Sequence, residues 1–582
     1  MLDLEIGESV GRDAPALNLM SPDVSRHPWL KSYPAGLAWD TVIEPQPLWR
    51  LLDDAVAAYA ALPAIDFLGQ RTSYRELGAL VDRAARGLAD LGVKPGIKVG
   101  LFLPNSPYFV ILYFAVLKAG GTVVNFNPLY APEEIRRQIE DSETEIMAVL
   151  DLKSLYGKLA GLLGTSRLKR LVVCPMAEIL PLAKRLLFQV TMRRKLAAVP
   201  ADERHIAFGA LTDNAGGFEP VEIEPRSALA LLQYTGGTTG VPKGAMLTHA
   251  NVYINARQCA LWFPRDATRQ EKMLGVLPFF HVFAMTTVMN WSLTAGAEMI
   301  LLPRFELKGL LQTIDAKKPT GFSGVPTLFT AIINHPRIAD YDLSSLVFGI
   351  SGGAPLPDEV RRRFEALSGS KLVEGYGLSE CSPVVCCNLP LGAARPGSIG
   401  LPYPGTTVEI RSTEPPHALL ATEERGEICV RGPQVMAGYW KRPDETAAAF
   451  TDGAFRTGDV GYLDAEGFCY ITDRLKDMIN AGGYKIYPRL IEEAIYRHPD
   501  VADCAVVGVA DAYRGQTVKA FVVVRAGRTL DDQVLETFLK DKLSPIEMPK
   551  IYEFRPSLPK TAIGKIDKKL LVAAEATERR PA

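Results

Sequence analysis

The stretch YTGGTTGVPKG, residues 234–244, joins an apolar run to a second short strand-like run, and its positions 235 to 240 are three glycines and three threonines. Glycine adopts backbone angles that are closed to other residues, so successive amides can turn toward one polyphosphate. The residues alone support two interpretations about equally, a phosphate-binding loop and an ordinary hairpin turn. A phosphate-binding loop would use the glycine amides, the threonine hydroxyls and one cation: Gly236, Gly237, Gly240, Thr235, Thr238, Thr239 and Lys243.

The residues after these glycines distinguish the stretch from the phosphate loop of nucleoside triphosphatases. That loop needs Gly-Lys-Ser/Thr at the opening of a helix. Here Lys243 precedes Gly244, and the letters AMLT follow. The sequence therefore argues against a kinase or a GTPase.

Length and charge restrict the class of protein and of partner. A chain of 582 residues is too long for one hydrophobic core and predicts several domains. Its 65 basic residues nearly balance its 66 acidic ones, so no overall field favours nucleic acid or an anionic membrane. We expect small molecules as partners and no nucleic acid. The oligomeric state, a homodimer included, cannot be read from the sequence.

Cysteine spacing and hydropathy indicate a cytoplasmic protein. The eight cysteines form no CxxC pair and no Cys/His cluster, so we expect buried, reduced thiols. The N-terminal residues MLDLEIGESVGRD are acidic and lack the apolar core of a secretory signal. The longest apolar run, YFVILYFAVL at 108–117, is too short to cross a bilayer. We therefore do not expect an integral membrane protein.

Alternating strand-like and helical patterns predict an α/β fold. Residues 1–45 hold many prolines and aromatic residues without periodicity and predict an extended arm. From a capping box at Ser73 and Glu76, an amphipathic helix leads into the strand-like runs KVGLFLP, TVVNFN and IMAVLD, separated by helices. This alternation predicts right-handed parallel units. A second such half follows the glycine-rich stretch.

The last third of the chain has a different pattern of strand-like and helical runs. From about residue 400 to 473, the short alternating runs VEIRS, EICVRG and FCYITD predict a small β-barrel or sandwich. Residues 474–582 predict a small, separate α+β domain with helices near 488–498 and 531–543. We thus expect a large N-terminal domain over 46–473, made of two parallel-sheet halves and the barrel, and a small mobile C-terminal domain.

Residues 176–200 interrupt the alternation. The run LAKRLLFQVTMRRKL mixes leucines with the cations Lys184, Arg185, Arg193, Arg194 and Lys195. A basic amphipathic helix at the surface is one interpretation and predicts peripheral contact with a membrane. The other, favoured about two to one because the apolar stripe is irregular, is a solvated insertion over an edge of the core.

The longer string QYTGGTTGVPKGAMLTHANV resembles the signature loop of the acyl-adenylate-forming superfamily, most closely that of bacterial long-chain fatty-acyl-CoA ligases. Further motifs of that superfamily follow in the expected order, and the resemblance covers residues 50–575. SGGAPLP at 351–357 and EGYGLSE at 374–380 resemble its adenine and magnesium motifs. The resemblance implies contacts to ATP or AMP from Gly353, Ala354, Pro355, Glu374, Gly375, Tyr376, Gly377 and Ser379.

The same resemblance implies that Glu380 and Thr238 hold Mg²⁺. A hard cation that bridges phosphates prefers oxygen ligands, so a carboxylate suits the position. Glu380 could instead be an acid at the start of a helix. Ser379 stands where most relatives have threonine, and the hydroxyl is retained.

Two motifs near the predicted domain boundary resemble the ribose and hinge motifs. In FRTGD at 455–459, Asp459 would accept hydrogen bonds from both ribose hydroxyls. In DRLKDMI at 473–479, Arg474 would approach the ribose and Lys476 would be the pivot of a hinge over 474–477. Asp473 replaces the commoner glycine.

The resemblance also implies the remaining catalytic and tunnel residues. Lys565, in LPKTAIGKIDKKLL, would serve adenylation by stabilising charge as the α-phosphorus is attacked; without the resemblance it would read as a solvated lysine. His281, in PFFHVFAM, would close the carboxylate site until the thiol arrives; it could also be a satisfied core histidine. The CoA tunnel would run beside Gly482 and Gly483, and the acyl tunnel beside Met285, Gly324 and Val325.

The sequence therefore predicts an ATP-dependent ligase that forms an acyl-adenylate with Mg²⁺ and then an acyl-CoA. A medium or long fatty acid is the expected substrate. The alternatives are a dicarboxylic or aromatic acid, transfer to a separate acyl carrier protein instead of CoA, and a binding protein without catalysis.

Overall fold

Two large sheets and one small sheet organise the chain in a computed structural model, which describes residues 27–235, 242–263, 265–390, 392, 395–481, 484–511, 514–561 and 566–578. The first sheet has the strand order β19-β9-β8-β4-β3-β5-β6-β7. From β4 to β7 its neighbours pair in parallel, as the alternation of strands and helices predicts. Its strands are β3 (Lys98–Phe102), β4 (Thr122–Asn125), β5 (Thr144–Leu150), β6 (Arg170–Cys174), β7 (His205–Ala207), β8 (Leu229–Thr235), β9 (Lys243–Thr248) and β19 (Gly438–Tyr439).

β8 and β9 pair antiparallel on either side of the glycine-rich stretch. Tyr234, just before that stretch, donates its hydroxyl to Asp141 Oδ2 at 2.6 Å. Asp141 lies near the end of α4 (Pro132–Ser142) and also accepts from Arg442 Nη2 at 2.9 Å. Because Lys243 opens a strand, the arrangement differs from the helix-opening loop of nucleoside triphosphatases.

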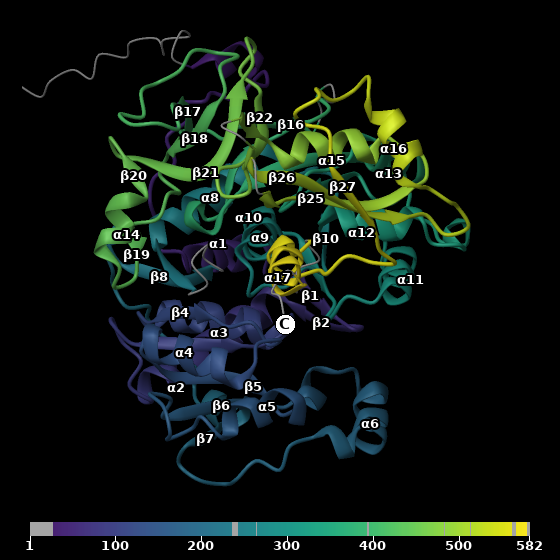
Figure 1. The fold of residues 1–582 in the computed structure, drawn as a ribbon. Helices are drawn as coiled ribbons and strands as arrows, with labels where there is room; N and C mark the ends of the chain where they lie inside the picture. The colour runs from purple at the N-terminus through teal and green to yellow at the C-terminus, as the bar shows by residue number, and fades with distance from the viewer. Residues whose placement is uncertain are drawn as a thin grey trace, which may run out of the picture.

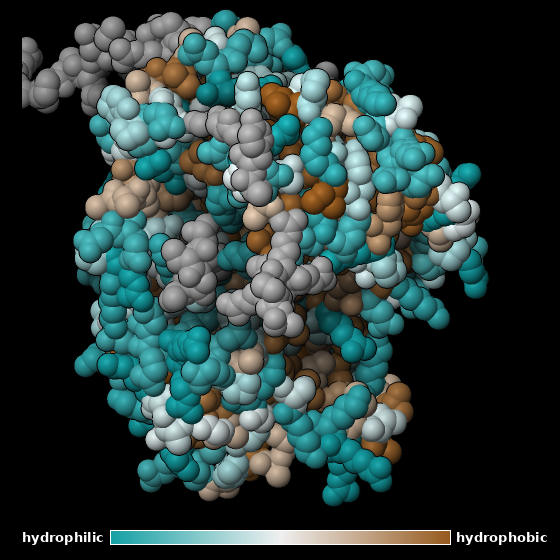
Figure 2. Space-filling model, in the orientation of Figure 1, coloured by the Kyte–Doolittle hydropathy of each residue, from teal (hydrophilic) through white to brown (hydrophobic). Residues whose placement is uncertain are grey.

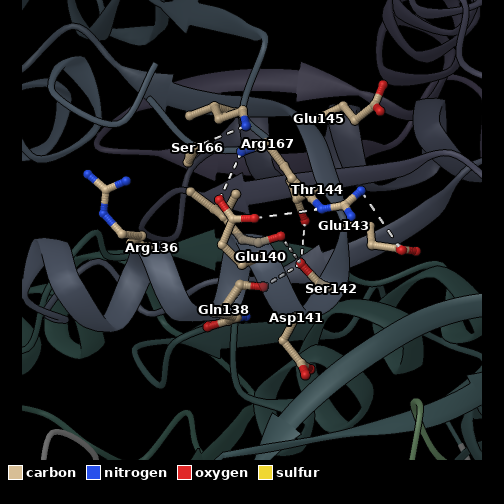
Figure 3. Close-up of polar contacts among 12 residues, drawn as sticks. Arg136, Gln138, Glu140, Asp141, Ser142, Glu143, Thr144, Glu145, Ser166 and Arg167 are labelled. Atoms are coloured by element: carbon tan, nitrogen blue, oxygen red, sulfur yellow. Dashed lines mark hydrogen bonds and ion pairs between the residues drawn. The ribbon is translucent and has the colours of Figure 1, made fainter. Parts of the chain in front are cut away.

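The turn from α4 into β5 fixes Asp141 (Figure 3). Glu143 ends the helix in the left-handed region, at φ 60°. The Arg167 guanidinium holds Glu140 and Glu143 at 3.6 and 3.9 Å, while the Ser142 and Thr144 hydroxyls lie 2.7 Å apart. In the figure Asp141 points away from this cluster. Its carboxylate accepts from Tyr234 and Arg442 instead.

The second sheet continues from parallel strands into the barrel strands. Its path is β17-β18-β21-β22-β16-β15-β14-β13-β12-β10-β11-β1-β2, with β20 paired to β21. Parallel pairing runs from β14 to β1, and the pairs from β14 to β17 are antiparallel. The strands are β1 (Pro63–Phe67), β2 (Gln70–Ser73), β10 (Lys272–Gly275), β11 (Glu298–Leu301), β12 (Gly321–Gly324), β13 (Phe348–Ser351), β14 (Lys371–Gly377), β15 (Val384–Cys387), β16 (Ser398–Pro402), β17 (Thr407–Arg411), β18 (Gly426–Arg431), β20 (Phe450–Thr451), β21 (Ala454–Leu463) and β22 (Cys469–Arg474).

Helices pack against these sheets, and Figure 1 shows the first sheet in the lower part of the molecule and the barrel strands above it. The apolar helix α3 is buried along its whole length. The further helices of the two halves are α1 (Arg50–Tyr59), α2 (Tyr74–Asp90), α3 (Pro107–Lys118), α5 (Lys153–Ala160), α6 (Leu182–Thr191), α7 (Phe208–Thr212), α8 (His249–Trp262), α9 (Val282–Ala284), the π-helix η4 (Met285–Asn290), α10 (Trp291–Ala295), α11 (Leu307–Lys317), α12 (Pro326–Ile333), α13 (Asp358–Ser368), the 3₁₀ turn η6 (Ser379–Cys381) and α14 (Pro443–Ala448).

The C-terminal part has its own sheet and its own apolar cores. The path β24-β23-β26-β25 pairs antiparallel, and β27 joins β26 in parallel. Its elements are β23 (Ile479–Ala481), β24 (Tyr484–Ile486), α15 (Pro488–Tyr496), β25 (Val501–Asp511), β26 (Gly515–Val524), α16 (Asp532–Leu539), β27 (Ile551–Phe554) and α17 (Lys568–Glu578). A large N-terminal and a small C-terminal α/β part thus confirm the predicted fold class.

The described part of the N-terminal arm packs on the barrel. The 3₁₀ turn η1 (Pro28–Ser32) buries Trp29 completely. Tyr33 donates its hydroxyl to the Pro402 carbonyl, and Trp39 donates its indole N–H to the Thr406 carbonyl, both at 2.8 Å. The arm is therefore fixed by specific contacts.

No helix in the described ranges is both long enough and apolar enough to cross a bilayer. All eight cysteines lie in the described ranges, where they are buried and form no disulfide. Burial raises the pKa of the Cys381 and Cys504 thiols well above the usual range, so these groups stay protonated and unreactive.

Candidate active site

A cavity of about 420 Å³ lies where the two large sheets meet the start of the C-terminal part. It brings together predicted residues that are up to 241 positions apart, since Thr235 and Lys476 both line it. The predicted residues in its wall are Thr235, Lys243, His281, Val325, Gly353, Gly375, Tyr376, Gly377, Ser379, Glu380, Asp459, Arg474 and Lys476.

Asp459 is the centre of one polar group. Its side chain is 3% exposed, and each of its oxygens has a partner: Arg474 Nε lies 2.9 Å from Oδ1, and the Tyr376 hydroxyl donates to Oδ2 at 2.6 Å. The Asp459 charge raises the pKa of Arg474. Burial, followed by the charge of Asp459, raises the pKa of Tyr376 well above its usual range. The group is thus a buried carboxylate held by two donors.

The turn before Asp459 explains its orientation. Thr457 donates its hydroxyl to the Ile428 carbonyl of β18 at 2.7 Å, and Arg456 Nη2 lies 2.8 Å from Glu427 Oε2. Gly458 has φ 72°, in the region that favours glycine, and donates its N–H to Glu427 Oε1 at 3.1 Å. The motif FRTGD is therefore an irregular strand segment pinned to its neighbour.

Glu380 is the centre of a second polar group. It lies half-buried in η6, and the Tyr439 hydroxyl donates to its Oε1 at 2.8 Å. Lys243 Nζ lies 5.3 Å from the centre of the Tyr439 ring and 3.9 Å from Glu445 Oε1. Burial raises the pKa of Glu380 above its ordinary value. A desolvated carboxylate of this kind is stabilised by a cation.

This second group fits a magnesium ion that also binds phosphate. Within the described ranges, no cluster of three or more His, Cys, Asp or Glu side chains has the arrangement of a metal site. Magnesium is usually held by one or two carboxylates together with substrate phosphates and water, so a lone cavity carboxylate is an adequate protein ligand. Glu380 would supply it.

His281 precedes α9 and faces the cavity. Its Nδ1 accepts a hydrogen bond from the Phe283 N–H at 3.3 Å and so caps the helix. This bond fixes Nδ1 at the start of α9 in a residue that lines the cavity.

The junction between the large and small parts lies at the rim. Asp473 Oδ2 accepts the N–H of Arg489 in the first turn of α15 at 2.9 Å, and Oδ1 accepts the Arg474 N–H at 2.7 Å. Burial raises the pKa of Asp473 to about 6. Desolvation, together with the charge of Arg474, lowers the pKa of Lys476. Asp473 thus ties the predicted hinge to the C-terminal part.

Part of the cavity wall is apolar. This apolar compartment is lined by Phe263 just after α8, Trp291 of α10, Phe348 and Ile350 of β13, Cys387 of β15, Tyr403 and Cys259. Trp291 and Phe348 pack edge to face, with ring centres 5.7 Å apart. One continuous space thus joins a polar compartment to an apolar one.

Several predicted residues lie elsewhere. Met285, Gly324, Ala354 and Pro355 are not among the residues that line this cavity. Met285 is fully buried, with its sulfur 3.7 Å from Asn125 Nδ2, and a Cβ at Gly324 would meet the Phe329 ring at 2.8 Å. The structure therefore does not bring these two to the apolar compartment.

Glu374 also lies outside the cavity. It lines a separate, smaller one with Arg361 and Asn388, and burial raises its pKa to about 7. A nucleotide contact from this residue remains a prediction.

Six further predicted positions fall outside the described residues. They are the loop residues Gly236, Gly237, Thr238, Thr239 and Gly240 and the catalytic candidate Lys565. The same holds for the CoA-tunnel residues Gly482 and Gly483.

The sequence did not identify Tyr439 or the residues of the apolar compartment. Tyr439 lies 59 positions from Glu380 and follows no motif that we used. These residues come from distant segments of the chain, and each looks like an ordinary core residue in its own stretch: Cys259 in α8, Phe263 just after it, Trp291 in α10, Phe348 in β13 and Tyr403 just after β16. The pairing of β13, β14 and β15 would have been needed to find them.

Two family descriptions match the chain. Residues 52–440 match "AMP-binding enzyme", and residues 490–565 match "AMP-binding enzyme C-terminal domain".

Relatives and solved structures cover nearly the whole chain. A protein named long-chain-fatty-acid–CoA ligase from Bacillus subtilis (strain 168) is 44% identical over 95% of this chain and 98% of its own. One of the same name from Escherichia coli O157:H7 is 37% identical over 92% and 96%. The crystal structure of ATP-bound MatB from Rhodopseudomonas palustris superposes with a TM-score of 0.80 at 28% identity, over 92% of this chain and all of that one.

Proposed function

The chain belongs to the family of AMP-binding enzymes, and from this premise we propose that it is an ATP-dependent fatty-acyl-CoA ligase. The observation that most strongly supports this proposal is the 44% identity to a long-chain-fatty-acid–CoA ligase over 95% of the chain. The cavity agrees with it, because a polar compartment opens into an apolar one of aromatic and aliphatic side chains. A medium or long fatty acid is the substrate we propose.

The reaction has two steps. A carboxylate oxygen of the acid attacks the α-phosphorus of ATP, the bond to the bridging oxygen breaks, and pyrophosphate leaves the acyl-adenylate. The CoA sulfur then attacks the acyl carbon, the bond to the AMP oxygen breaks, and the thiol proton passes to solvent. The products are acyl-CoA and AMP.

The site residues take distinct parts in the first step of the proposed reaction. Asp459, held by Arg474 and Tyr376, would accept hydrogen bonds from the ribose hydroxyls. Thr235 and Ser379 offer hydroxyls, and Lys243 offers a positive charge to phosphate oxygens. Thr238 and Glu380 would hold Mg²⁺, which would neutralise charge on the phosphates when bound. Lys565 would stabilise charge near the α-phosphate.

The second step needs a changed arrangement of the small part. Rotation about Lys476 would withdraw Lys565 and present Gly482 and Gly483 to the CoA pantetheine. His281, which lines the cavity, would close the carboxylate site until the thiol enters. The buried, unpaired cysteines agree with a cytoplasmic location.

A substrate series tests the function. AMP release is measured with ATP, Mg²⁺ and CoA across mono- and dicarboxylic acids of graded length and aromatic acids. We expect the highest kcat/KM for monocarboxylic acids of medium or long chain, because the inner compartment offers apolar contacts to a chain. AMP release confined to aromatic or dicarboxylic acids would contradict the substrate, and no AMP release with any acid would contradict the reaction.

Separate half-reactions test the role of Lys565. We expect Lys565→Ala to slow adenylate formation by about two to three orders of magnitude, as for loss of a preorganised charge donor. Transfer to CoA from supplied acyl-adenylate should persist. Adenylation is measured by pyrophosphate–ATP exchange, with Lys569→Ala as the neighbouring control. Equal loss of both half-reactions would contradict the role.

A further inference from the structure

One face of α6 is uncovered. Leu182, Leu186, Leu187 and Val190 expose 73%, 57%, 63% and 80% of their surface, and none of the helix residues is buried. The other exposed large hydrophobic residues of the described ranges are scattered, with at most two in any eight-residue segment. Contiguous exposed apolar surface in a folded protein usually marks a site of interaction.

The exposed residues form a stripe. At 100° per residue, Leu182, Leu186, Val190 and Leu187 fall within an arc of about 140°. Phe188 lies on the opposite side and packs against the main core, and Lys184 Nζ donates to the Leu68 carbonyl at 2.7 Å. The helix is therefore held by its other face, and the stripe points away from the body.

The figures show where this stripe lies. In Figure 1, α6 lies at the lower right margin, apart from the sheets. Figure 2 shows hydrophobic residues at the same margin, next to hydrophilic ones.

The charged residues of the segment that carries the stripe have one sign. Residues 179–201 contain no aspartate or glutamate but five cations: Lys184, Arg185, Arg193, Arg194 and Lys195. Three of them form the exposed 3₁₀ turn η3 (Arg193–Lys195) directly after α6. This segment carries a formal charge of +5 in a chain whose net charge is −1. The concentration of positive charge at an apolar stripe complements a surface that is anionic outside and apolar beneath.

We propose that α6 and η3 form a docking surface for an anionic phospholipid bilayer. The leucine stripe enters the boundary between headgroups and acyl chains, and the cations contact the phosphates. A helix of 10 residues is too short to cross the bilayer, so the contact is peripheral. This inference goes beyond the proposed reaction and does not rest on it.

Vesicle sedimentation of the full chain tests the docking. Vesicles of phosphatidylcholine alone are compared with vesicles that contain about 30% phosphatidylglycerol, at low and high salt. We expect at least tenfold more binding to the anionic vesicles than to the neutral ones. This difference should disappear at 0.5 M salt, because salt screens the attraction between charges that are more than a few ångströms apart. Equal binding to both vesicle types, or none, would overturn the proposal.

Matched variants separate the two components of the surface. Leu186→Ser with Leu187→Ser should lower binding at least tenfold, and Arg193→Gln, Arg194→Gln and Lys195→Gln together should remove the preference for anionic vesicles. The control, Leu419→Ser with Val534→Ser, changes residues that are 63% and 50% exposed elsewhere and should bind as the wild type does. If the Leu186 and Leu187 variant bound equally well, the surface would lie elsewhere.

Labelling gives a second readout. Because the native cysteines are all buried, Leu187→Cys offers one accessible thiol for an environment-sensitive dye, and Val534→Cys offers a control. Anionic vesicles should shift the emission of the first dye to the blue and leave the second unchanged. A blue shift without vesicles that follows protein concentration, together with a lighter species for the Leu186 and Leu187 variant in sedimentation velocity, would indicate self-association and overturn the lipid proposal.

Discussion

The hydrogen bond from Tyr439 to Glu380 has a consequence for the pH dependence of adenylation. Burial raises the pKa of Glu380, and the Tyr439 hydroxyl opposes this rise. A hydrogen bond to a carboxylate favours its charged form and so lowers its pKa. In Tyr439→Phe, the acidic limb of the adenylation rate should therefore move to higher pH. Pyrophosphate–ATP exchange from pH 5.5 to 8 measures this.

Tyr462→Phe serves as the control for that change. Tyr462 stacks on Tyr470 in the barrel, with ring centres 5.0 Å apart, and does not line the cavity. Its variant should keep the profile of the wild type. If the acidic limb of the pH profile were unchanged in Tyr439→Phe, Glu380 would not be the group that sets this limb.

Glu374 predicts a pH-dependent stability. Burial raises its pKa from 4.5 to about 7, so the folded state binds a proton more tightly than the unfolded state does. The free energy of unfolding that this group contributes is therefore present below about pH 4.5 and lost as pH rises to about 7. Glu374→Gln has no proton to lose at this position. The free energy of unfolding of the variant, minus that of the wild type, should therefore rise by up to about 3 kcal/mol between about pH 4.5 and 7.

Urea midpoints at pH 4.5, 6 and 7.5 measure the difference. Glu359→Gln, whose side chain is 61% exposed, should show no such trend. Glu374→Gln should also retain adenylation within about threefold, because Glu374 does not line the main cavity. A loss of a hundredfold would instead support the nucleotide contact that the resemblance implies.

At the scale of single residues, the sequence predicted those site residues that lie inside recognisable motifs. Tyr376, Glu380, Asp459 and Arg474 are in such motifs, and the structure brings all four to one cavity. Tyr439 could not be predicted, because a hydroxyl that supports a distant carboxylate has no local pattern.

Among the elements, the segment between β22 and β23 carries the proposed hinge. Lys476 lies there, between Asp473, which accepts from α15, and the first strand of the small sheet. Proline fixes φ, so Lys476→Pro should block a change of backbone angles at this position. Adenylation should stay within about threefold, and acyl transfer to CoA should fall at least a hundredfold. Single-turnover measurements of each half-reaction decide this.

Lys476→Ala separates the backbone from the side chain. It removes the amine but leaves φ free, so acyl transfer should largely persist. If the alanine and proline variants lost transfer equally, the side chain would matter and the hinge would lie elsewhere.

Periodic elements were predictable and irregular ones were not. The capping box of α2 is present as the letters predict, with Ser73 Oγ accepting the Glu76 N–H at 3.2 Å. By contrast, α1, β1 and β2 precede the first regular element that the sequence analysis identified. β2 reads QRTS and is exposed or half-buried, so it lacks the alternation of a half-buried strand. The π-helix η4 is fully buried, and periodicity does not distinguish it from an α-helix.

At the scale of the whole molecule, the N-terminal arm closes on the barrel through Gly467. This glycine has φ 82°, and a Cβ there would lie 2.0 Å from the Trp29 backbone nitrogen. Gly527 has φ 77° but open space around it. Both alanine variants have the strain of a left-handed residue, about 1 kcal/mol, but only Gly467→Ala also clashes. We expect it to be less stable than Gly527→Ala by at least about 2 kcal/mol.

Thermal unfolding of the two variants measures this difference. Gly467→Ala should lower the unfolding midpoint by several degrees more than Gly527→Ala does. Equal midpoints would mean that the arm contributes little to the stability of the barrel.

The second sheet runs without interruption from the parallel strands into the barrel. Phe348 and Ile350 on β13, Tyr376 on β14, Cys387 on β15 and Asp459 on β21 all belong to it, and all line the cavity. The nucleotide and the fatty chain would therefore both bind against residues of one continuous sheet. Rotation of the small domain would leave these residues in place. We therefore expect the length of acid that is accepted to be set during adenylation, before the CoA thiol enters.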